Sequence, residues 1–237
     1  MHISSLPSPY GIGTMGKEAV KFVDFLEKAG QTYWQILPIC PTSYGDSPYQ
    51  SFSSFAGNPY FIDLELLCKE KLLKKAECEA VAWGSDPRRV DYGTMYHSRY
   101  TVLRKASERF LKSVPEDFAG FCEREAEWLD DYALFMALKD AHNGMAWPNW
   151  ERELKFREEN ALAEAREEYA EDILFYKTIQ YLFFKQWRAL KAYANEKGIR
   201  IIGDVPIYVA GDSADVWANP TQFYLDENLD PIDVAGC

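Results

Sequence analysis

The sequence repeats one arrangement twice: a helix-forming stretch, then a glycine, then a short apolar run. In the first copy, apolar residues fall at helical spacing over residues 17–29, Gly30 follows, and "YWQILPI" comes next. In the second, "ILFYKTIQYLFFKQWRALKAYANEKG" ends at Gly198 and leads directly into "IRIIGDVPIYV". Short runs that are almost wholly apolar are typical of strands buried on both faces. The pattern therefore predicts two αβ steps of a parallel α/β fold.

A long region of helical pattern separates the two steps. From about Leu64 to Trp150 the helical spacing is broken by turn signals such as "GSDP" and "NGMAWPNW". From Glu151 to Asp172 Glu and Arg are densely mixed, which is typical of a solvated helix face. We therefore divide the chain into a first α/β portion at 1–63, a mostly helical insertion at 64–172, and a second α/β portion at 173–237.

The charge balance limits the possible partners. The 237 residues include 26 Lys and Arg against 37 Asp and Glu, a formal net charge of -11. Nucleic acids and anionic membrane surfaces are bound by clustered Lys and Arg, so we expect neither as a partner. The N-terminal residues lack the pattern of an export signal, and no stretch reaches the roughly 18 apolar residues of a membrane span. We expect a cytoplasmic protein with a neutral ligand.

The sequence contains no recognisable metal or cofactor motif. The five cysteines are scattered without CxxC spacing, which indicates free thiols, and His2, His97 and His142 share no ligand spacing. The glycines of "GIGTMG" match the dinucleotide-binding pattern GxGxxG. However, a proline-broken turn precedes them where that fingerprint needs a strand. We interpret them as loop and helix-entry glycines, and we predict no cofactor and no metal.

The stretch "YGDSPYQSFSSFAGNPY", from Tyr44 to Tyr60, follows the first apolar run and contains no Leu, Ile or Val. It combines aromatic rings with hydrogen-bonding groups, which is what carbohydrate recognition needs. Tyr rings stack on the apolar face of a pyranose, and polar side chains pair with its hydroxyls. The polar candidates here are Asp46, Ser47, Gln50 and Asn58. An ordered loop packed on its own aromatic rings explains the same residues equally well.

Asp204 ends the second predicted strand. Active sites of parallel α/β barrels lie at the carboxyl ends of their strands. A carboxylate beside a buried strand is costly unless it is paired or has a function. Asp204 could therefore cap the next element or form a structural pair, or it could bind a sugar hydroxyl or assist catalytic carboxylates.

Several segments resemble a known family. "SLPSPYGIG", "YWQILPICPTSYGDSPYQSFSSFAGNPYFID", "FYKTIQYLFFKQW" and "GIRIIGDVPIYVAGDSADVWANP" closely resemble the 4-alpha-glucanotransferases of the amylomaltase type. The resemblance runs essentially from Met1 to Cys237 and is weakest between about Leu66 and Asn149. It implies an α/β fold that is the N-terminal part of a (β/α)8 TIM barrel, from the end of strand 1 through strand 3. A largely helical insertion would follow strand 2.

The resemblance also implies a function. The family transfers α-1,4-glucan segments between maltodextrins, or to glucose, with retention at the anomeric carbon and without a cofactor. A carboxylate nucleophile and a second, acid/base carboxyl group carry this chemistry. The expected partners are maltodextrin, amylose or glycogen-derived glucans, with glucose as an acceptor.

Individual positions match family residues. Tyr49 matches the ring beside the donor glucose, and Asp204 matches the strand-three aspartate that faces the donor sugar. Tyr44 matches a tyrosine of a second glucan site on the outer surface. The neighbours of Tyr49 that we expect at the same rim are Asp46, Ser47 and Gln50.

The family's Arg-x-Asp-His and Glu-Asp-Leu-Gly motifs, which carry the nucleophile and the acid/base group, do not occur in this sequence. We therefore expect no catalytic residue within the chain and place both carboxyl groups beyond Cys237. We expect the chain to be an inactive N-terminal portion of the enzyme that folds poorly alone. The alternative is a non-catalytic glucan-binding fragment.

Overall fold

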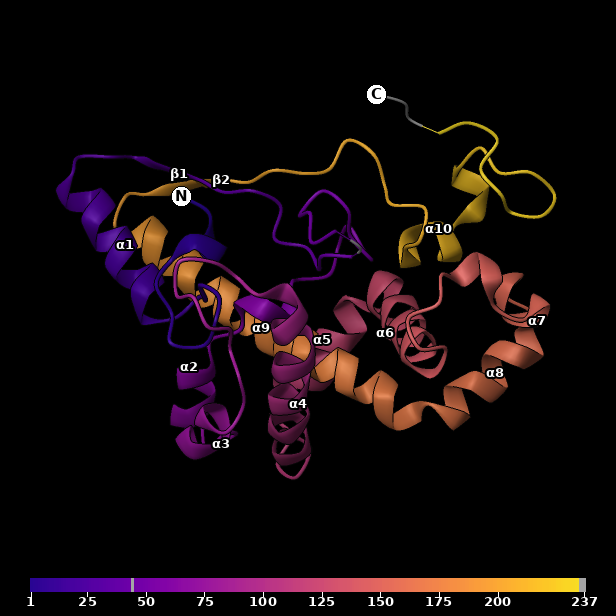
Figure 1. Cartoon of the computed structure of the whole chain (residues 1–237), viewed down its shortest axis with the longest axis horizontal. Coiled ribbons are helices and arrows are strands. Elements are labelled where there is room, and N and C mark those ends of the chain that lie inside the picture. The colour runs from indigo at the N-terminus through magenta and orange to yellow at the C-terminus, as the bar shows by residue number, and fades with distance from the viewer. Residues whose placement is uncertain (44, 235–237) are drawn as a thin grey trace. The chain divides into compact units, whose positions relative to one another are not determined.

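The computed structural model describes residues 1–43 and 45–234, and within them the chain is mostly helical with one small parallel sheet (Figure 1). The strands are β1 (Tyr33–Gln35) and β2 (Arg200–Ile202). The helices are α1 (Lys17–Lys28), α2 (Leu64–Lys69), α3 (Lys75–Glu79), α4 (Tyr92–Phe110), α5 (Asp117–Arg124), α6 (Ala126–Ala141), α7 (Arg152–Lys155), α8 (Glu159–Glu168), α9 (Ala170–Glu196) and α10 (Ala214–Ala218). Short 3₁₀ helices lie at Ile3–Ser5, Pro59–Phe61, Trp147–Asn149 and Pro220–Gln222.

The chain divides into two compact units, each built from three segments. Unit 1 comprises Met1–Ile39, Gly57–Glu116 and Thr178–Asp204. Unit 2 comprises Cys40–Ala56, Asp117–Lys177 and Val205–Cys237. These units group segments by packing, whereas the three portions expected from the sequence follow the order of the chain. The three-portion division therefore stays a prediction.

Unit 1 contains the sheet, in which β1 and β2 run side by side and parallel (Figure 1). Trp34 is opposite Ile201 in the register. Beyond the register, Ile36 N donates to Ile202 O at 3.0 Å, and Arg200 N donates to Thr32 O at 2.8 Å. Both predicted strands therefore exist, and their predicted parallel relation is confirmed.

The expectation that both strands are buried on both faces is wrong. Trp34 is 2% exposed and packs edge-on against Phe22 of α1 at 5.2 Å, whereas Tyr33 is 52% exposed and Ile202 45% exposed. Successive side chains of a strand point to opposite faces of the sheet. The face that carries Trp34 is covered by α1, and the opposite face is open to solvent within the described residues.

Helices α1 and α9 appear where the apolar spacing predicts them. The glycines that follow them, Gly30 and Gly198, have φ angles of +67° and +74°. In this left-handed region a residue with a Cβ is strained, so glycine ends each helix and turns the chain toward the strand.

Two glutamines of α9 hold the segment Gly57–Asp63 in unit 1. The Gln180 carboxamide accepts from Gly57 N at 2.7 Å and donates to Gly57 O at 2.9 Å. The Gln186 carboxamide makes the same two contacts with Asp63, at 2.6 and 3.2 Å. Both glutamines are buried, so these bonds satisfy backbone groups that water cannot reach.

The core of unit 2 is aromatic and surrounds α6. Phe135 of α6 lies 5.5 Å from the Trp150 ring and 5.9 Å from the Trp217 ring of α10. The two indole N–H groups donate to backbone carbonyls, Trp150 to Met145 and Trp217 to Leu154. These tryptophans therefore serve the core of unit 2.

Within the described residues, no helix combines the length and the apolar character that crossing a membrane would require.

Candidate functional site

Residues 45–50, part of the aromatic and polar stretch singled out in the sequence, form a compact turn in unit 2 that we call the 45–50 loop. Thr42 and Ser51 form an antiparallel bridge at its base, and Ser43 N donates to Gln50 O at 3.0 Å. Inside the loop, Gln50 N donates to Ser47 O at 3.1 Å, and Asp46 has a left-handed φ of +55°. The loop is therefore ordered by its own backbone bonds.

The side chains proposed to bind sugar lie mostly on the surface of this loop. Tyr49 is 44% exposed, and Asp46 and Gln50 are also exposed. Ser47 is half-buried, and its hydroxyl accepts from Tyr49 N at 3.3 Å. Loss of hydration raises the pKa of Asp46 above its ordinary value. The structure thus brings an exposed ring and several hydrogen-bonding groups together on one loop.

Two phenylalanines that follow the loop pack on α6. Phe52 lies 6.3 Å from the Phe135 ring, and Phe55 stacks on Trp128 at 6.4 Å with 17° between the planes. The alternative interpretation had the stretch packed on its own aromatic rings. For Phe52 and Phe55 the partner is instead a helix from the region expected to be an insertion.

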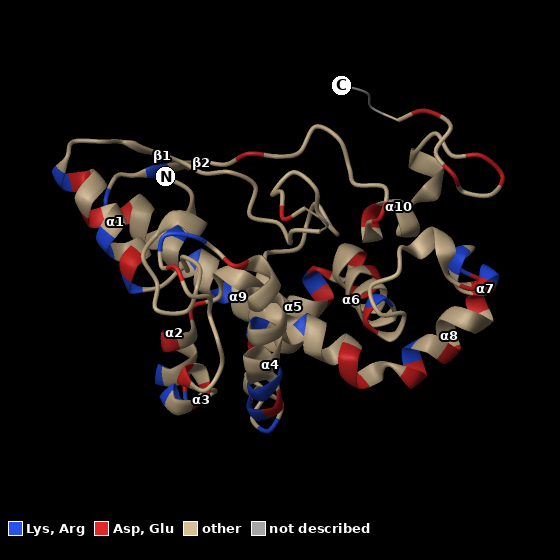
Figure 2. Cartoon of the chain, viewed as in Figure 1, with Lys and Arg blue, Asp and Glu red and all other residues tan. Residues whose placement is uncertain are grey.

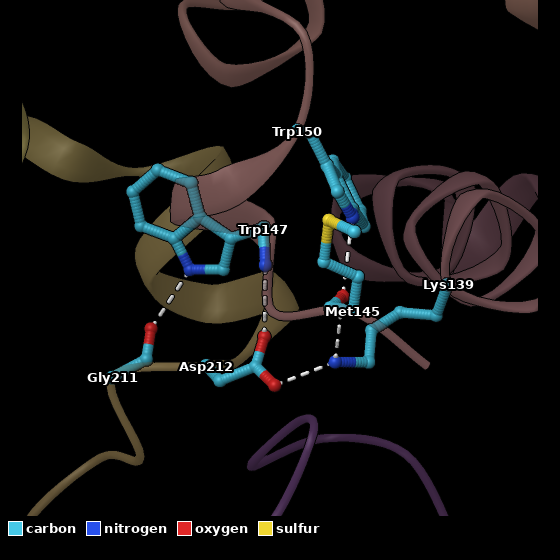
Figure 3. A network of polar contacts seen from close by, with 6 residues as sticks. All are labelled: Lys139, Met145, Trp147, Trp150, Gly211 and Asp212. Carbon is cyan, nitrogen blue, oxygen red and sulfur yellow. Dashed lines mark hydrogen bonds and ion pairs between the residues drawn. The ribbon is translucent and has the colours of Figure 1, made fainter. Parts of the chain in front are cut away.

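A polar network centred on Lys139 of α6 lies next to Phe52 (Figure 3). The ammonium group donates to Asp212 Oδ2 at 2.5 Å and to Met145 O at 3.2 Å, and it lies 5.1 Å from the centre of the Phe52 ring. The other carboxylate oxygen of Asp212 accepts from Trp147 N at 3.2 Å. Since Lys139 is only 4% exposed, its charge is neutralised by Asp212 and does not face a ligand.

The remaining predicted positions fall elsewhere. The expectation that Asn58 pairs with a sugar hydroxyl is wrong, because this side chain lies in unit 1, is 2% exposed and caps the 3₁₀ helix Pro59–Phe61 by accepting from Tyr60 N at 2.9 Å. Asp204 lies two residues after β2 in unit 1 and is half-buried. Tyr44 lies outside the described residues. The sequence reasoning assigned no role to Lys139, Asp212 or Asp215. The available signal was the presence of charged residues beside apolar residues in "FMALKDA" and "GDSADVW".

The glycines of the GxGxxG match occupy the positions expected of loop and helix-entry residues. Gly11 has a φ of +79°, and Gly16 is the N-cap of α1. A Cβ on Gly16 would lie 1.9 Å from Asp63 Oδ2, and one on Gly13 would lie 1.9 Å from Ile3 O. Close packing therefore accounts for two of these glycines.

The cysteines within residues 1–43 and 45–234 are free thiols, as predicted. Burial raises the pKa of Cys78 to about 12 and that of Cys40 to about 11, so both are neutral near pH 7. Among the same residues, His, Cys, Asp and Glu side chains form no group that could hold a metal ion.

The sequence stretches that carry the candidate residues lack positive charge. Neither residues 29–68 nor residues 201–237 contain Lys or Arg. Figure 2 shows this as tan and red ribbon in both stretches, whereas blue and red alternate on α4, α7 and α8. An anionic ligand would need cations that these stretches do not supply.

Comparison with known proteins assigns the family. The sequence model of the 4-alpha-glucanotransferase family matches residues 1–237. The 4-alpha-glucanotransferase of Clostridium butyricum is 53% identical over 238 residues and that of Thermus thermophilus 53% over 240, each covering all of this chain. The chain belongs to the 4-alpha-glucanotransferase family.

A solved structure supports the same assignment. The amylomaltase from Streptococcus agalactiae, in complex with acarbose, matches the whole chain with a TM-score of 0.97 and 46% identity. The amylomaltase from Corynebacterium glutamicum, at 20% identity and a TM-score of 0.65, shares the fold. The chain spans 49% of the Clostridium protein and 47% of the Thermus protein, about half the length of these relatives.

Proposed function

We propose that the chain is the N-terminal portion of a 4-alpha-glucanotransferase that transfers α-1,4-glucan segments between maltodextrins or to glucose with retention. The observation that carries this proposal is the match of the whole chain to an amylomaltase in complex with acarbose. The exposed loop and the absence of Lys and Arg from residues 29–68 agree with a neutral glucan as the ligand.

In this proposal β1 and β2 are the second and third strands of a (β/α)8 barrel, and the helical region between them is an insertion. Two supporting features are their parallel pairing and the open face of the sheet at Tyr33 and Ile202. In a barrel, further strands continue the sheet on either side, and closure places one face of the sheet in a filled interior.

The 45–50 loop would contribute to glucan binding. Tyr49 offers a half-exposed ring to stack on a pyranose, and Asp46, Ser47 and Gln50 supply hydrogen-bonding groups on the same loop. For Asp204 the proposed contact with a donor sugar rests on the resemblance. The same holds for Tyr44 and the second glucan site.

The chain itself would not catalyse transfer, because its sequence lacks the Arg-x-Asp-His and Glu-Asp-Leu-Gly motifs. A retaining transfer needs both a nucleophilic carboxylate and an acid/base group. The test is incubation of the purified 237-residue chain with maltotriose, followed by chromatography. We expect unchanged maltotriose, and release of glucose together with longer maltodextrins would contradict the proposed inactivity.

A second candidate function is binding of glucan without catalysis, which is favoured by the ordered and exposed 45–50 loop. Calorimetric titration with acarbose or maltoheptaose tests it. Saturable binding that Tyr49→Ala weakens about tenfold supports it, since loss of one stacked ring removes about 1–2 kcal/mol. A folded chain that binds neither ligand contradicts it.

A further inference from the structure

The residues that follow the 45–50 loop are attached to the start of α10 by three contacts. Ala214 N donates to Phe52 O at 2.8 Å. Asp215 Oδ2 accepts from Ser54 N at 2.7 Å, and Asp215 Oδ1 accepts from the Ser53 hydroxyl at 3.4 Å. Two consecutive residues of α10 thus hold three consecutive residues of the segment.

The Asp215 contacts also orient the Ser53 hydroxyl. By donating to Asp215, this hydroxyl directs its lone pairs toward Phe55 N at 3.1 Å and Ala56 N at 3.3 Å, from which it accepts. Ser53 is 1% exposed, so water cannot replace the carboxylate as its acceptor. The bonds from Phe55 N and Ala56 N therefore depend on this orientation, while the Ser51 hydroxyl separately accepts from Ser53 N at 3.2 Å and donates to Ser53 O at 2.7 Å.

Helix α10, which carries Asp215, is itself held in place by buried contacts. Ser213 is fully buried, and its hydroxyl caps α10 by accepting from Val216 N at 3.3 Å. Trp217, at 1% exposure, fills the aromatic core around α6. Because α10 is held at both its cap and its buried ring, Asp215 has a defined position.

The residues held by α10 are directly connected to the 45–50 loop. Ser51 bridges Thr42, and Gln50 O accepts from Ser43 N, directly before the residues that α10 holds. A shift of Phe52–Ser54 therefore displaces Gln50 and Tyr49 along the backbone.

We propose that Asp215 is a positioning residue that holds the 45–50 loop in the arrangement that presents Tyr49 and Gln50 to a glucan. The inference rests on the proposed function for its ligand and on the α10 contacts for its mechanism. Asp215 does not touch the glucan itself.

The experiment compares Asp215→Ala with the wild type by two measurements, both in the complete enzyme of which this chain is proposed to be the N-terminal portion. The first is amide hydrogen exchange of peptides that cover residues 45–54, and the second is calorimetric titration with acarbose. We expect exchange in 45–54 to accelerate about tenfold or more, with wild-type exchange in α6, and acarbose binding to weaken about tenfold. Asp215→Asn retains one acceptor oxygen and should give intermediate values.

The matched control is Asp130→Asn, which removes a carboxylate of α6 that pairs with Lys177 in the same unit. We expect wild-type exchange in 45–54 and wild-type acarbose affinity for this variant. An equal acceleration of 45–54 in Asp130→Asn would show general destabilisation and would overturn the proposal.

Acarbose binding tests the proposed glucan site, and hydrogen exchange tests the positioning role of Asp215. If the wild-type enzyme does not bind acarbose, the proposed glucan site fails, while the exchange comparison still tests the positioning role. Wild-type exchange of 45–54 in Asp215→Ala overturns that role. If Asp215→Ala does not fold, Asp215→Asn takes its place, because it removes the charge and one acceptor oxygen at Asp215 and leaves the Ser53 hydroxyl in place. Faster exchange of 45–54 in that variant supports the role, and wild-type exchange overturns it.

Discussion

A Cβ on Gly57 would lie 2.0 Å from Cδ1 of the Phe183 ring, so the backbone at Gly57 packs directly on the aromatic face of α9. Phe183 is fully buried, and Gly57 N and O are both bonded to the Gln180 carboxamide. The glycine in "FAGNP" therefore allows the chain to approach α9 closely enough for this two-point contact. The absence of a side chain matters here for space, since the φ of Gly57 lies outside the left-handed region.

We predict that Gly57→Ala lowers the free energy of unfolding by at least about 2 kcal/mol, because the methyl group overlaps a buried ring that cannot move aside. Urea denaturation measures the change. Gly203→Ala is the matched control, since a Cβ there meets nothing within 4 Å, and its effect should be within about 0.5 kcal/mol. Equal stability of the two variants would contradict the packing argument.

A second prediction concerns the Gln180 side chain. Gln180→Ala leaves Gly57 N–H and C=O buried without partners, and we expect a loss of about 2–4 kcal/mol in the free energy of unfolding. The control is Gln31→Ala, which removes an exposed glutamine bonded to Ala29 O at 3.2 Å, with an expected change within about 0.5 kcal/mol. A Gln180→Ala effect no larger than that of Gln31→Ala would show that water satisfies Gly57 in the variant.

The sequence predicted α1, α9, β1 and β2 well, because their signals are local. Apolar spacing marks α1 and α9, and the left-handed Gly30 and Gly198 mark where they end. The order helix, glycine, strand then predicted the parallel pair β1 and β2. The burial of these strands was not predictable in the same way, since it depends on which elements cover each face, as Trp34 and Tyr33 show.

The site was predictable only in part. The composition of the 45–50 loop indicated its exposed polar and aromatic surface, which the structure shows at Tyr49. Its attachment to Asp215 joins residues about 160 positions apart, and no local pattern indicates which carboxylate will accept from Ser54 N. The same limit applies to Gln180 and Gly57, which are 123 residues apart.

A third prediction concerns the buried ion pair of Figure 3. Lys139→Met leaves the Asp212 carboxylate and Met145 O without their cation. We expect a loss of about 2–3 kcal/mol in unfolding free energy, below the full value for a buried pair, because the Asp212 side chain is 34% exposed.

The control for Lys139→Met is Lys21→Met, which breaks a pair with Glu18 in which the lysine side chain is 56% exposed. Its effect should be within about 0.5 kcal/mol. Tryptophan fluorescence during urea denaturation follows both variants, since Trp147 and Trp150 adjoin the network. If the two variants lose equally little unfolding free energy, the Lys139–Asp212 pair makes no net contribution to stability.

The fourth prediction concerns the loss of stability at acidic pH through Glu77. Arg109 donates to both carboxylate oxygens of Glu77, at 2.7 and 2.5 Å, and Lys74 N donates at 2.8 Å. The Arg109 hydrogen bonds, followed by that of Lys74 N, lower the pKa of Glu77 from 4.5 to about 2. Since the folded pKa lies below the unfolded one, this contact stabilises the fold above about pH 4.5, and its contribution disappears as the pH falls toward 2.

The measurement is the free energy of unfolding from pH 7 to pH 2 for the wild-type chain and Glu77→Gln. We expect the advantage of the wild type to be largest above pH 5 and to shrink steadily toward pH 2, because a glutamine cannot release a proton. Arg109→Met removes the main cause of the shift and should flatten the same part of the wild-type profile. An advantage that is constant across the whole range would mean that Glu77 titrates normally in the folded chain.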